Sequence, residues 1–122
     1  MNKDDKLEHM FDLQNKLQKK LGTWEKIKTD SDLQQFVNQQ ILAVHEEAVE
    51  IMRESAYKNP EMVKFGWKKG QQWNVKNYKE EVVDLMHFVM NLSLAVGMDA
   101  KEFYNRYCEK NGVNHDRKKE GY

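Results

Sequence analysis

Glu47-Ala-Val-Glu50 and Glu81-Val-Val-Asp84 are the two stretches from which the fold of this chain can be worked out. Each stretch places two carboxylates three residues apart, and residues at that spacing are neighbours on one face of an α-helix. Apolar residues recur around each pair at helical spacing. The sequence therefore predicts two helices, each with a pair of carboxylates on one side.

Helical periodicity extends over most of the chain, and the predicted fold is an all-α bundle of about four helices. The predicted helices run from about Asp4 to Leu21, from Asp30 or Ser31 to about Ala56, from Val75 to Val96, and from Asp99 to about Lys110. Gly22 and Gly97 follow two of these segments, at the position where glycine commonly ends a helix. Residues 57–74 contain the single proline and two tryptophans, and they are predicted to form a loop.

One domain is predicted over residues 1–122, because a chain of 122 residues falls within the usual size of a domain. Asp99 and Glu102 have the spacing of a capping box at the start of the last helix. Residues 111–122 follow that helix and are rich in basic side chains, so we expect a C-terminal tail or lid there.

The predicted hydrophobic core is thin, because 39% of the residues are hydrophobic, 33% are charged and the mean hydropathy is −0.94. The expected core positions are Leu7, Met10, Phe11, Leu13, Leu17 and Leu21 in the first helix, and Leu33, Phe36, Val37, Ile41, Val44, Ala48 and Ile51 in the second. Four helices of this kind leave apolar surface uncovered. We therefore expect the bundle to be completed by homo-oligomerisation, as a homodimer or alternatively a tetramer.

The charge balance indicates no nucleic-acid or membrane partner, since 20 basic residues match 20 acidic ones. Cys108 is the single cysteine, which excludes an internal disulfide and a cysteine-rich zinc site. The charged N-terminus lacks the apolar stretch of a signal peptide. No apolar run reaches the length of about 20 residues that a membrane span needs. We expect a soluble cytoplasmic protein.

The two acidic pairs are predicted to meet around a hard divalent cation. On a helical wheel, Glu47 lies at the edge of its apolar stripe and Glu81 lies inside the apolar face of its helix. Carboxylates that face a core are costly unless they are paired or bind metal. Carboxylates from two facing helices suit Mg²⁺ and point to metal-assisted phosphate chemistry. The ordinary alternative is a solvated acidic face.

The Asp84-x-x-His87 pair allows a di-iron site as an alternative interpretation. Di-iron bundles use two Glu-x-x-His pairs, whereas this chain has one comparable pair, so Mg²⁺ is the preferred ion. Asn91 lies one to two turns beyond the acidic residues, where it either reaches a base or sugar or is an ordinary buried amide. Trp67 lies in the predicted loop beside two lysines and is the aromatic residue best placed to stack on a base.

Taken together, these motifs resemble a known family. Residues 45–50 (HEEAVE) and 81–88 (EVVDLMHF) are similar to the all-α nucleoside triphosphate pyrophosphohydrolases of the MazG-like superfamily. The Asp-x-x-His-Phe ending of the second motif, the Trp-Lys at 67–68 and the closing motif over residues 110–122 look most like the dimeric dUTP diphosphatases.

This resemblance implies hydrolysis of a nucleoside triphosphate to the monophosphate and pyrophosphate. It implies metal binding by Glu47, Glu50, Glu81 and Asp84, with two or more Mg²⁺ ions per site or Mn²⁺ in their place. It also implies triphosphate contacts at Lys110, Asn114, Arg117 and Tyr122, and base contacts at Gln14 and, by a weaker match, Gln18. For the chemistry, we expect Glu47 or Glu50 to accept the proton of the attacking water.

The expected substrate is dUTP, with dCTP or a purine triphosphate as alternatives. A non-catalytic helical module that binds nucleotide or cation would use the same carboxylates but release no pyrophosphate. A purely structural helical dimer would not respond to metal at all. Pyrophosphate release in the presence of Mg²⁺ identifies the enzyme, and the response to metal then separates the other two hypotheses.

Overall fold

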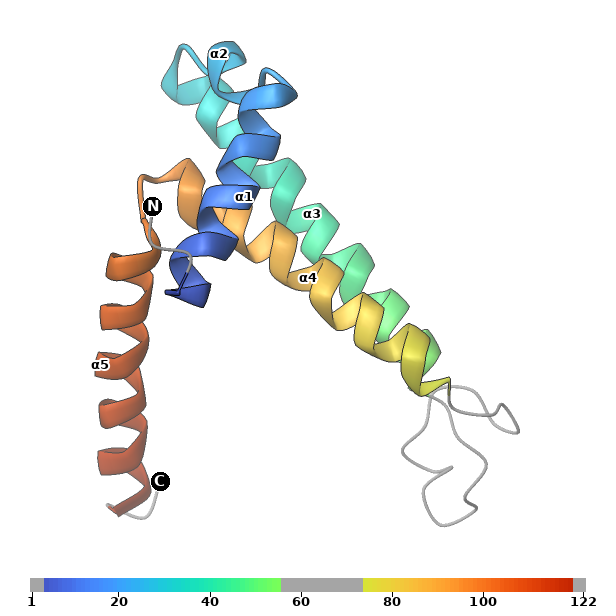
Figure 1. The fold of residues 1–122 in the computed structure, drawn as a ribbon, viewed down its shortest axis with the longest axis vertical. Coiled ribbons are helices and arrows are strands. Elements are labelled where there is room, and N and C mark those ends of the chain that lie inside the picture. Colours follow the sequence, from blue (N-terminus) through green and yellow to red (C-terminus); the bar gives the residue numbers. More distant parts are fainter. Residues whose placement is uncertain (1–3, 56–73, 120–122) are drawn as a thin grey trace. The chain divides into compact units, whose positions relative to one another are not determined.

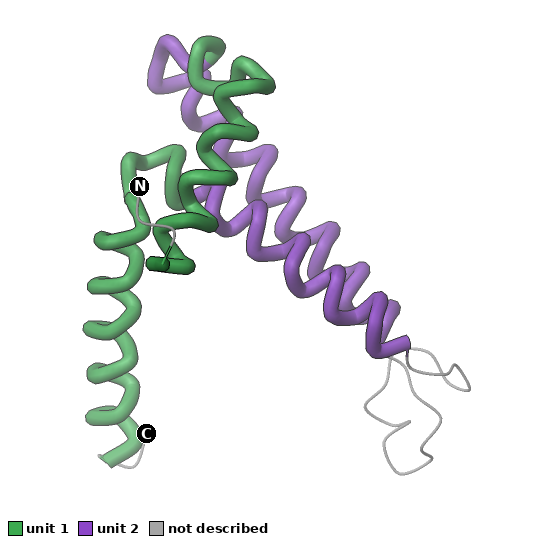
Figure 2. The backbone as a smooth tube through the Cα atoms, viewed as in Figure 1, with its two compact units in different colours: residues 1–26, 93–122 green, residues 27–92 purple. Residues whose placement is uncertain are grey.

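A computed structural model describes residues 4–55 and 74–119 of the chain, and it confirms the all-α class over these residues. The helices are α1 (Lys6–Lys20), α2 (Thr23–Lys26), α3 (Asp30–Glu54), α4 (Val75–Ala95) and α5 (Ala100–Lys119), as Figure 1 shows. The chain divides into two compact units (Figure 2). Unit 1 comprises residues 1–26 and 93–122, and unit 2 comprises residues 27–92.

Glycines end two helices where the sequence predicts that they should. Gly22 follows α1 with φ +72°, and Gly97 follows α4 with φ +76°. A side chain with a Cβ rarely adopts this left-handed conformation, whereas glycine does so without steric cost. At the other end of α1, the Asp5 carboxylate accepts a hydrogen bond of 3.0 Å from the backbone N–H of Glu8.

The start of α3 differs by one residue from the prediction of a cap at Asp30 or Ser31. Thr29 is the cap, and its hydroxyl accepts a hydrogen bond of 3.1 Å from the backbone N–H of Asp32. The Asp32 carboxylate accepts in return from the backbone N–H of Thr29, also at 3.1 Å. This reciprocal pair satisfies two backbone donors at once. The short helix α2 was not predicted.

Helix α5 is longer than the sequence suggests. The predicted Asp99 cap is present, since its carboxylate accepts a hydrogen bond of 2.9 Å from the backbone N–H of Glu102. The prediction that the helix ends near Lys110 is wrong, because α5 continues to Lys119. Residues 111–119 are therefore the last turns of a helix and not an irregular tail. These residues are mostly polar and form no apolar stripe, so helical periodicity does not mark them.

In unit 1, α1 packs against α2 and α5, and the rings of Phe11 and Phe103 lie 5.7 Å apart. Phe11 is buried as predicted, together with Gln14 and Gln18. The rest of the predicted core face is wrong for this helix, because Leu7 is half-buried and the other four predicted core residues are exposed. These exposed residues are Met10, Leu13, Leu17 and Leu21, with 41–58% of each accessible. Periodicity locates an apolar stripe, but it does not identify what covers it.

In unit 2, α3 and α4 run antiparallel, side by side (Figure 1). The Asn91 amide of α4 donates a hydrogen bond of 2.9 Å to the side-chain oxygen of Gln40 on α3. No residue of α3 is fully buried, and within its predicted core stripe Ile41 and Ala48 are exposed. Among the described residues, the buried hydrophobic ones are Phe11, Met90 and Ala100. The thin core expected from the composition is therefore what this part of the chain has.

No helix among the described residues is by itself both long and apolar enough to cross a membrane.

Replacing Thr29 with alanine tests the capping box of α3. We expect Thr29→Ala to lower the free energy of unfolding by about 1 kcal/mol, because the first turn loses an acceptor for its backbone N–H. Urea unfolding followed by circular dichroism measures this. Ser31→Ala, an exposed change two residues away, should cause little or no loss. Equal losses in both variants would contradict the assigned cap.

Candidate metal centre

Three carboxylates from α3 and α4 converge in unit 2. Glu47, Glu81 and Asp84 each contribute an oxygen, and these oxygens all lie within 4.8 Å of one another. Gln40 lies seven residues before Glu47, and Asn91 lies seven residues after Asp84, so the amide pair is about two turns away along the same two helices. That hydrogen bond ties the two helices together in the register that brings the carboxylates face to face.

The cluster perturbs the protonation of Glu81. The pKa of Glu81 is raised from 4.5 to about 7, mainly by a hydrogen bond with the Glu47 carboxyl. Partial desolvation and the negative charges of Glu47, Asp84 and Glu50 raise this pKa further. Two carboxyl groups can share a hydrogen bond only when one of them carries a proton. A proton on Glu81 is therefore one way in which this cluster relieves its repulsion.

Glu50, the fourth carboxylate that was predicted to bind metal, forms an ion pair instead of joining the three clustered carboxylates. Its Oε1 lies 3.1 Å from Nη1 of Arg53, one turn further along α3. The negative charge of Glu50 nevertheless contributes to the raised pKa of Glu81. The structure therefore brings together three of the four predicted residues and places the fourth at the edge of the cluster, in an ion pair.

The donor set fits a hard divalent cation. All of the clustered ligand atoms are carboxylate oxygens, which Mg²⁺, Mn²⁺ and Ca²⁺ accept. The Glu47 Oε2 atom is buried and has no hydrogen-bond donor, so a cation would satisfy it. The prediction that these carboxylates face an apolar interior overestimates their burial. Glu47 and Glu81 are half-buried and Asp84 is exposed, so the cluster is open to solvent on one side.

His87 lies outside this cluster. Its Nδ1 atom is 2.9 Å from the backbone carbonyl of Val83, one turn earlier in α4, and the side chain is exposed. When Nδ1 carries the proton, the ring donates to that carbonyl, which leaves Nε2 directed away from the helix backbone. The clustered atoms are all carboxylate oxygens and include no imidazole nitrogen.

The candidate base-binding amides are buried in the structure. Gln14 and Gln18 on α1 are 4% and 7% exposed, and Asn91 on α4 is 3% exposed. The Gln18 Oε1 atom accepts a hydrogen bond of 2.5 Å from the Thr23 hydroxyl. Sequence reasoning missed the partner residues Gln40 and Thr23, because hydrogen bonds between polar side chains leave no periodic signal.

The candidate phosphate-binding residues share one side of α5. Lys110, Asn114 and Arg117 follow one another at spacings of four and three residues, and all three are exposed. Such spacings place side chains on one helical face. Tyr122 and Trp67 were predicted to contact substrate as well, but both lie outside the described residues.

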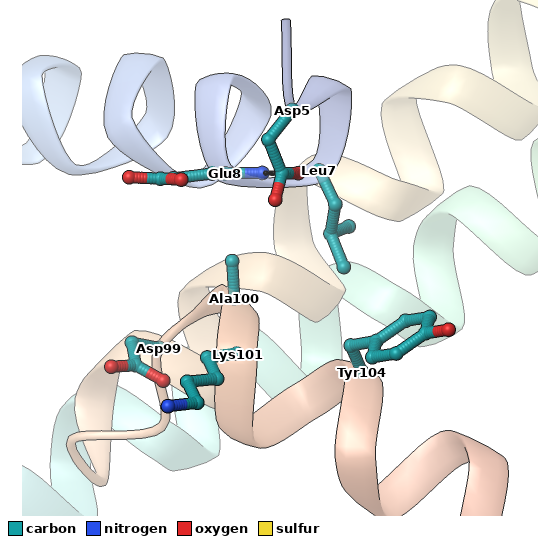
Figure 3. Close-up of a pocket in the computed structure, with 7 residues that line it drawn as sticks. All are labelled: Asp5, Leu7, Glu8, Asp99, Ala100, Lys101 and Tyr104. Atoms are coloured by element: carbon teal, nitrogen blue, oxygen red, sulfur yellow. Dashed lines mark hydrogen bonds between the residues drawn. The ribbon is translucent and has the colours of Figure 1, made fainter. Parts of the chain in front are cut away.

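Unit 1 contains a concavity lined by other residues. It has a volume of about 640 Å³ where the N-terminal turns of α1 and α5 meet (Figure 3). Two of its three acidic lining residues, Asp5 and Asp99, cap the two helices. Leu7 and Tyr104 add apolar surface to it (Figure 3). This concavity shares no residue with the carboxylate cluster, so we assign it no part in the chemistry.

Comparison with known proteins also relates the chain to proteins of nucleotide hydrolysis, in agreement with the clustered carboxylates. A sequence model of a protein family described as dUTPase matches residues 6–103. The chain is also similar to the dCTP pyrophosphatase of Enterobacteria phage T4, with 43% identity over 44 residues, which is 36% of this chain. The match spans about a quarter (26%) of the length of that relative. No solved structure matches the chain.

The raised pKa of Glu81 predicts how the cation-free protein responds to pH. Between pH 4.5 and about 7, the native state retains a proton that the unfolded state has released. Stability therefore falls as pH rises through this window, and this contribution levels off above it. We expect the midpoint of thermal unfolding in a chelator-treated sample to follow this trend.

Glu81→Gln should flatten the response, because the amide does not titrate. Glu80→Gln removes one charge at the neighbouring exposed position and should keep the wild-type slope. A wild-type slope in Glu81→Gln would contradict the assignment of the shared proton to this residue.

Proposed function

Since this chain belongs to the dUTPase family, we propose that it hydrolyses a deoxynucleoside triphosphate to the monophosphate and pyrophosphate. The observation that carries this proposal is the convergence of Glu47, Glu81 and Asp84 within 4.8 Å of one another. Hydrolysis of a polyphosphate needs positive charge beside the phosphates and an activated water. Clustered carboxylates provide the positive charge by binding a cation, and a basic carboxylate oxygen activates the water.

We propose that Glu47, Glu81 and Asp84 hold Mg²⁺, or Mn²⁺ in its place, and that Glu50 joins them. When bound, the cation neutralises phosphate charge and lowers the pKa of a water beside it. Two or more ions per site would suit a substrate with three phosphates. The buried Glu47 oxygen without a donor and the raised pKa of Glu81 both support a cation here.

We assign the proton transfer to a carboxylate on α3. Glu47 or Glu50 would accept the proton of the attacking water, and Glu47 is the better placed because it lies inside the cluster. Glu50 instead pairs with Arg53, with 3.1 Å between the two side chains, and is not among the clustered carboxylates. A positioned general base typically accelerates proton transfer by roughly 10²–10⁴-fold.

The exposed side of α5 is proposed to bind the triphosphate. Lys110 and Arg117 would contribute positive charge and Asn114 an amide donor, and all three project from one helical face. Arginine binds two phosphate oxygens at once, whereas lysine acts as a point charge. We propose that Tyr122 adds a hydroxyl donor and that residues 111–122 close over the substrate.

For the base, we propose contacts from Gln14, Gln18 and Asn91, with Trp67 stacking on the ring. Amide side chains offer both donors and acceptors, which the polar edge of a pyrimidine requires. We propose dUTP as the preferred substrate, since the matched family is described as dUTPase. The name of the phage relative supports dCTP as the second candidate.

We also propose that the chain forms a homodimer, with a tetramer as the alternative. The exposed stripe of α1 carries Leu13, Leu17 and Leu21, each 45–58% accessible. Few hydrophobic residues in the described part of the chain are buried. A second copy would cover this apolar surface, and two-fold assemblies are the most common way in which soluble proteins do so.

Glu47→Gln tests the catalytic assignment. We expect kcat for Mg²⁺-dependent pyrophosphate release to fall by roughly 10²–10⁴-fold, because the amide neither accepts the proton nor binds the cation well. The measurement is release of pyrophosphate and monophosphate from dUTP, dCTP, dTTP, dATP and dGTP.

Glu46→Gln is the matched control, since it removes the same charge at the neighbouring exposed position. This control should retain activity. Release of no pyrophosphate by the wild-type protein from any substrate would contradict the hydrolase proposal. Binding of nucleotide without hydrolysis would instead favour a sensor, and no response to Mg²⁺ would favour a structural role.

Leu17→Glu tests the proposed dimer. A charge placed in an apolar interface loses its hydration, so we expect dissociation to monomers in analytical ultracentrifugation. Lys19→Glu, an exposed change on the same helix, should leave the assembly intact. A monomeric wild-type protein would contradict the proposal directly.

A further inference from the structure

We propose that Arg53 changes its partner when the site fills: it pairs with Glu50 in the cation-free protein and with a phosphate oxygen once Glu50 turns to the cation. This inference rests on the proposed function for its second half, the phosphate contact. Its first half concerns cation binding alone and can be tested without any substrate.

The present partner of Arg53 is well defined. Its guanidinium lies 3.1 Å from Oε1 of Glu50, three residues earlier in α3. The side chains are 57% and 43% exposed, so both remain free to change rotamer at the surface. Ion pairs at this degree of exposure contribute only about 0.2–1 kcal/mol. The pair is therefore strong enough to be populated and weak enough to be broken by a better partner.

Glu50 has a better partner within reach. It occupies the same face of α3 as Glu47, one turn away. Its charge already acts on Glu81, since it contributes to the raised pKa of that residue. Hard divalent cations take about six or more oxygen ligands, and the three clustered carboxylates leave places unfilled. A cation at the cluster therefore competes with Arg53 for the Glu50 carboxylate.

Release of Glu50 would leave Arg53 as an unpaired cation at the edge of the acidic cluster. A polyphosphate on the bound cation would carry oxygens that face away from it, and a guanidinium binds such oxygens in a bidentate manner. Arg53 would then exchange a carboxylate for a phosphate. This exchange couples substrate binding to the arrival of the fourth carboxylate at the cation.

The pair also has an ordinary explanation. Arg53 lies in the last turn of α3, where the helix dipole favours a cation, and i,i+3 ion pairs are common on helices. That explanation predicts no effect of Arg53 on cation affinity through Glu50. A double-mutant cycle measures this coupling directly.

The first experiment titrates the purified protein with Mg²⁺ alone in a calorimeter. We expect Arg53→Gln to raise Mg²⁺ affinity by about two- to fivefold, since the cation no longer has to displace the guanidinium. In a Glu50→Gln background, the same change should give no gain. A gain that persists in this background, or no gain in either, would overturn the exchange.

Arg106→Gln is the matched control. Arg106 is also exposed and pairs with a glutamate on its own helix, with 2.7 Å between its Nε and Glu102 Oε2. Its removal should leave Mg²⁺ affinity unchanged. Thermal melts of each variant verify the fold before titration.

The second experiment uses inorganic pyrophosphate as the probe at saturating Mg²⁺. Here Arg53→Gln should weaken binding, by about tenfold, because a charge-assisted hydrogen bond is lost. The same substitution thus has opposite effects on the two ligands. Unchanged pyrophosphate affinity would overturn the phosphate contact. If the wild-type protein hydrolyses no triphosphate, the proposed function fails, whereas the Mg²⁺ cycle still decides the exchange between Arg53 and the cation.

Discussion

Repulsion among the carboxylates of Glu47, Glu81 and Asp84 is the constraint on which the rest of this site depends. Their oxygens lie within 4.8 Å of one another, and like charges at that distance do not persist without compensation. A proton on Glu81, whose pKa is about 7, is one compensation, and a shared cation is the other. Near neutral pH the two compete, because a cation must displace the shared proton. A cation bound here would therefore have to compete with the proton on Glu81.

The helices themselves were predictable because their determinants are local. Gly22 and Gly97 have the left-handed backbone that stops a helix, and their positions in the sequence marked both ends correctly. The residues that pack against each helix are not determined by the sequence of that helix alone. The apolar stripe of α1 is evident from periodicity, yet Leu17 is 45% exposed while Gln18 beside it is 7% exposed. The extension of α5 to Lys119 was missed for a related reason, since a polar helix has no stripe to detect.

The candidate site was partly predictable for a similar reason. Spacing of three residues places each acidic pair on one helical face, and the antiparallel pairing of α3 with α4 brings Glu47 to Glu81 and Asp84. The sequence does not specify which of the four carboxylates forms an ion pair outside the cluster. Glu50 satisfies the same spacing rule as Glu47, yet it pairs with Arg53. Nor does the sequence reveal that Asn91 bonds to Gln40, because an amide pair 51 residues apart follows no pattern.

The openness of the cluster determines how it can bind a polyanion. Asp84 is exposed and its two neighbours are half-buried, so the carboxylates keep part of their hydration and cost less to hold together than they would in a closed core. A triphosphate approaching the same carboxylates is repelled, and only bridging cations reverse the sign of that interaction. Under the proposed function, cation and triphosphate would therefore bind with positive coupling, each raising the affinity of the other. Arg53 pairs with Glu50 at the edge of this cluster, so the exchange of partners proposed for it would modulate this coupling.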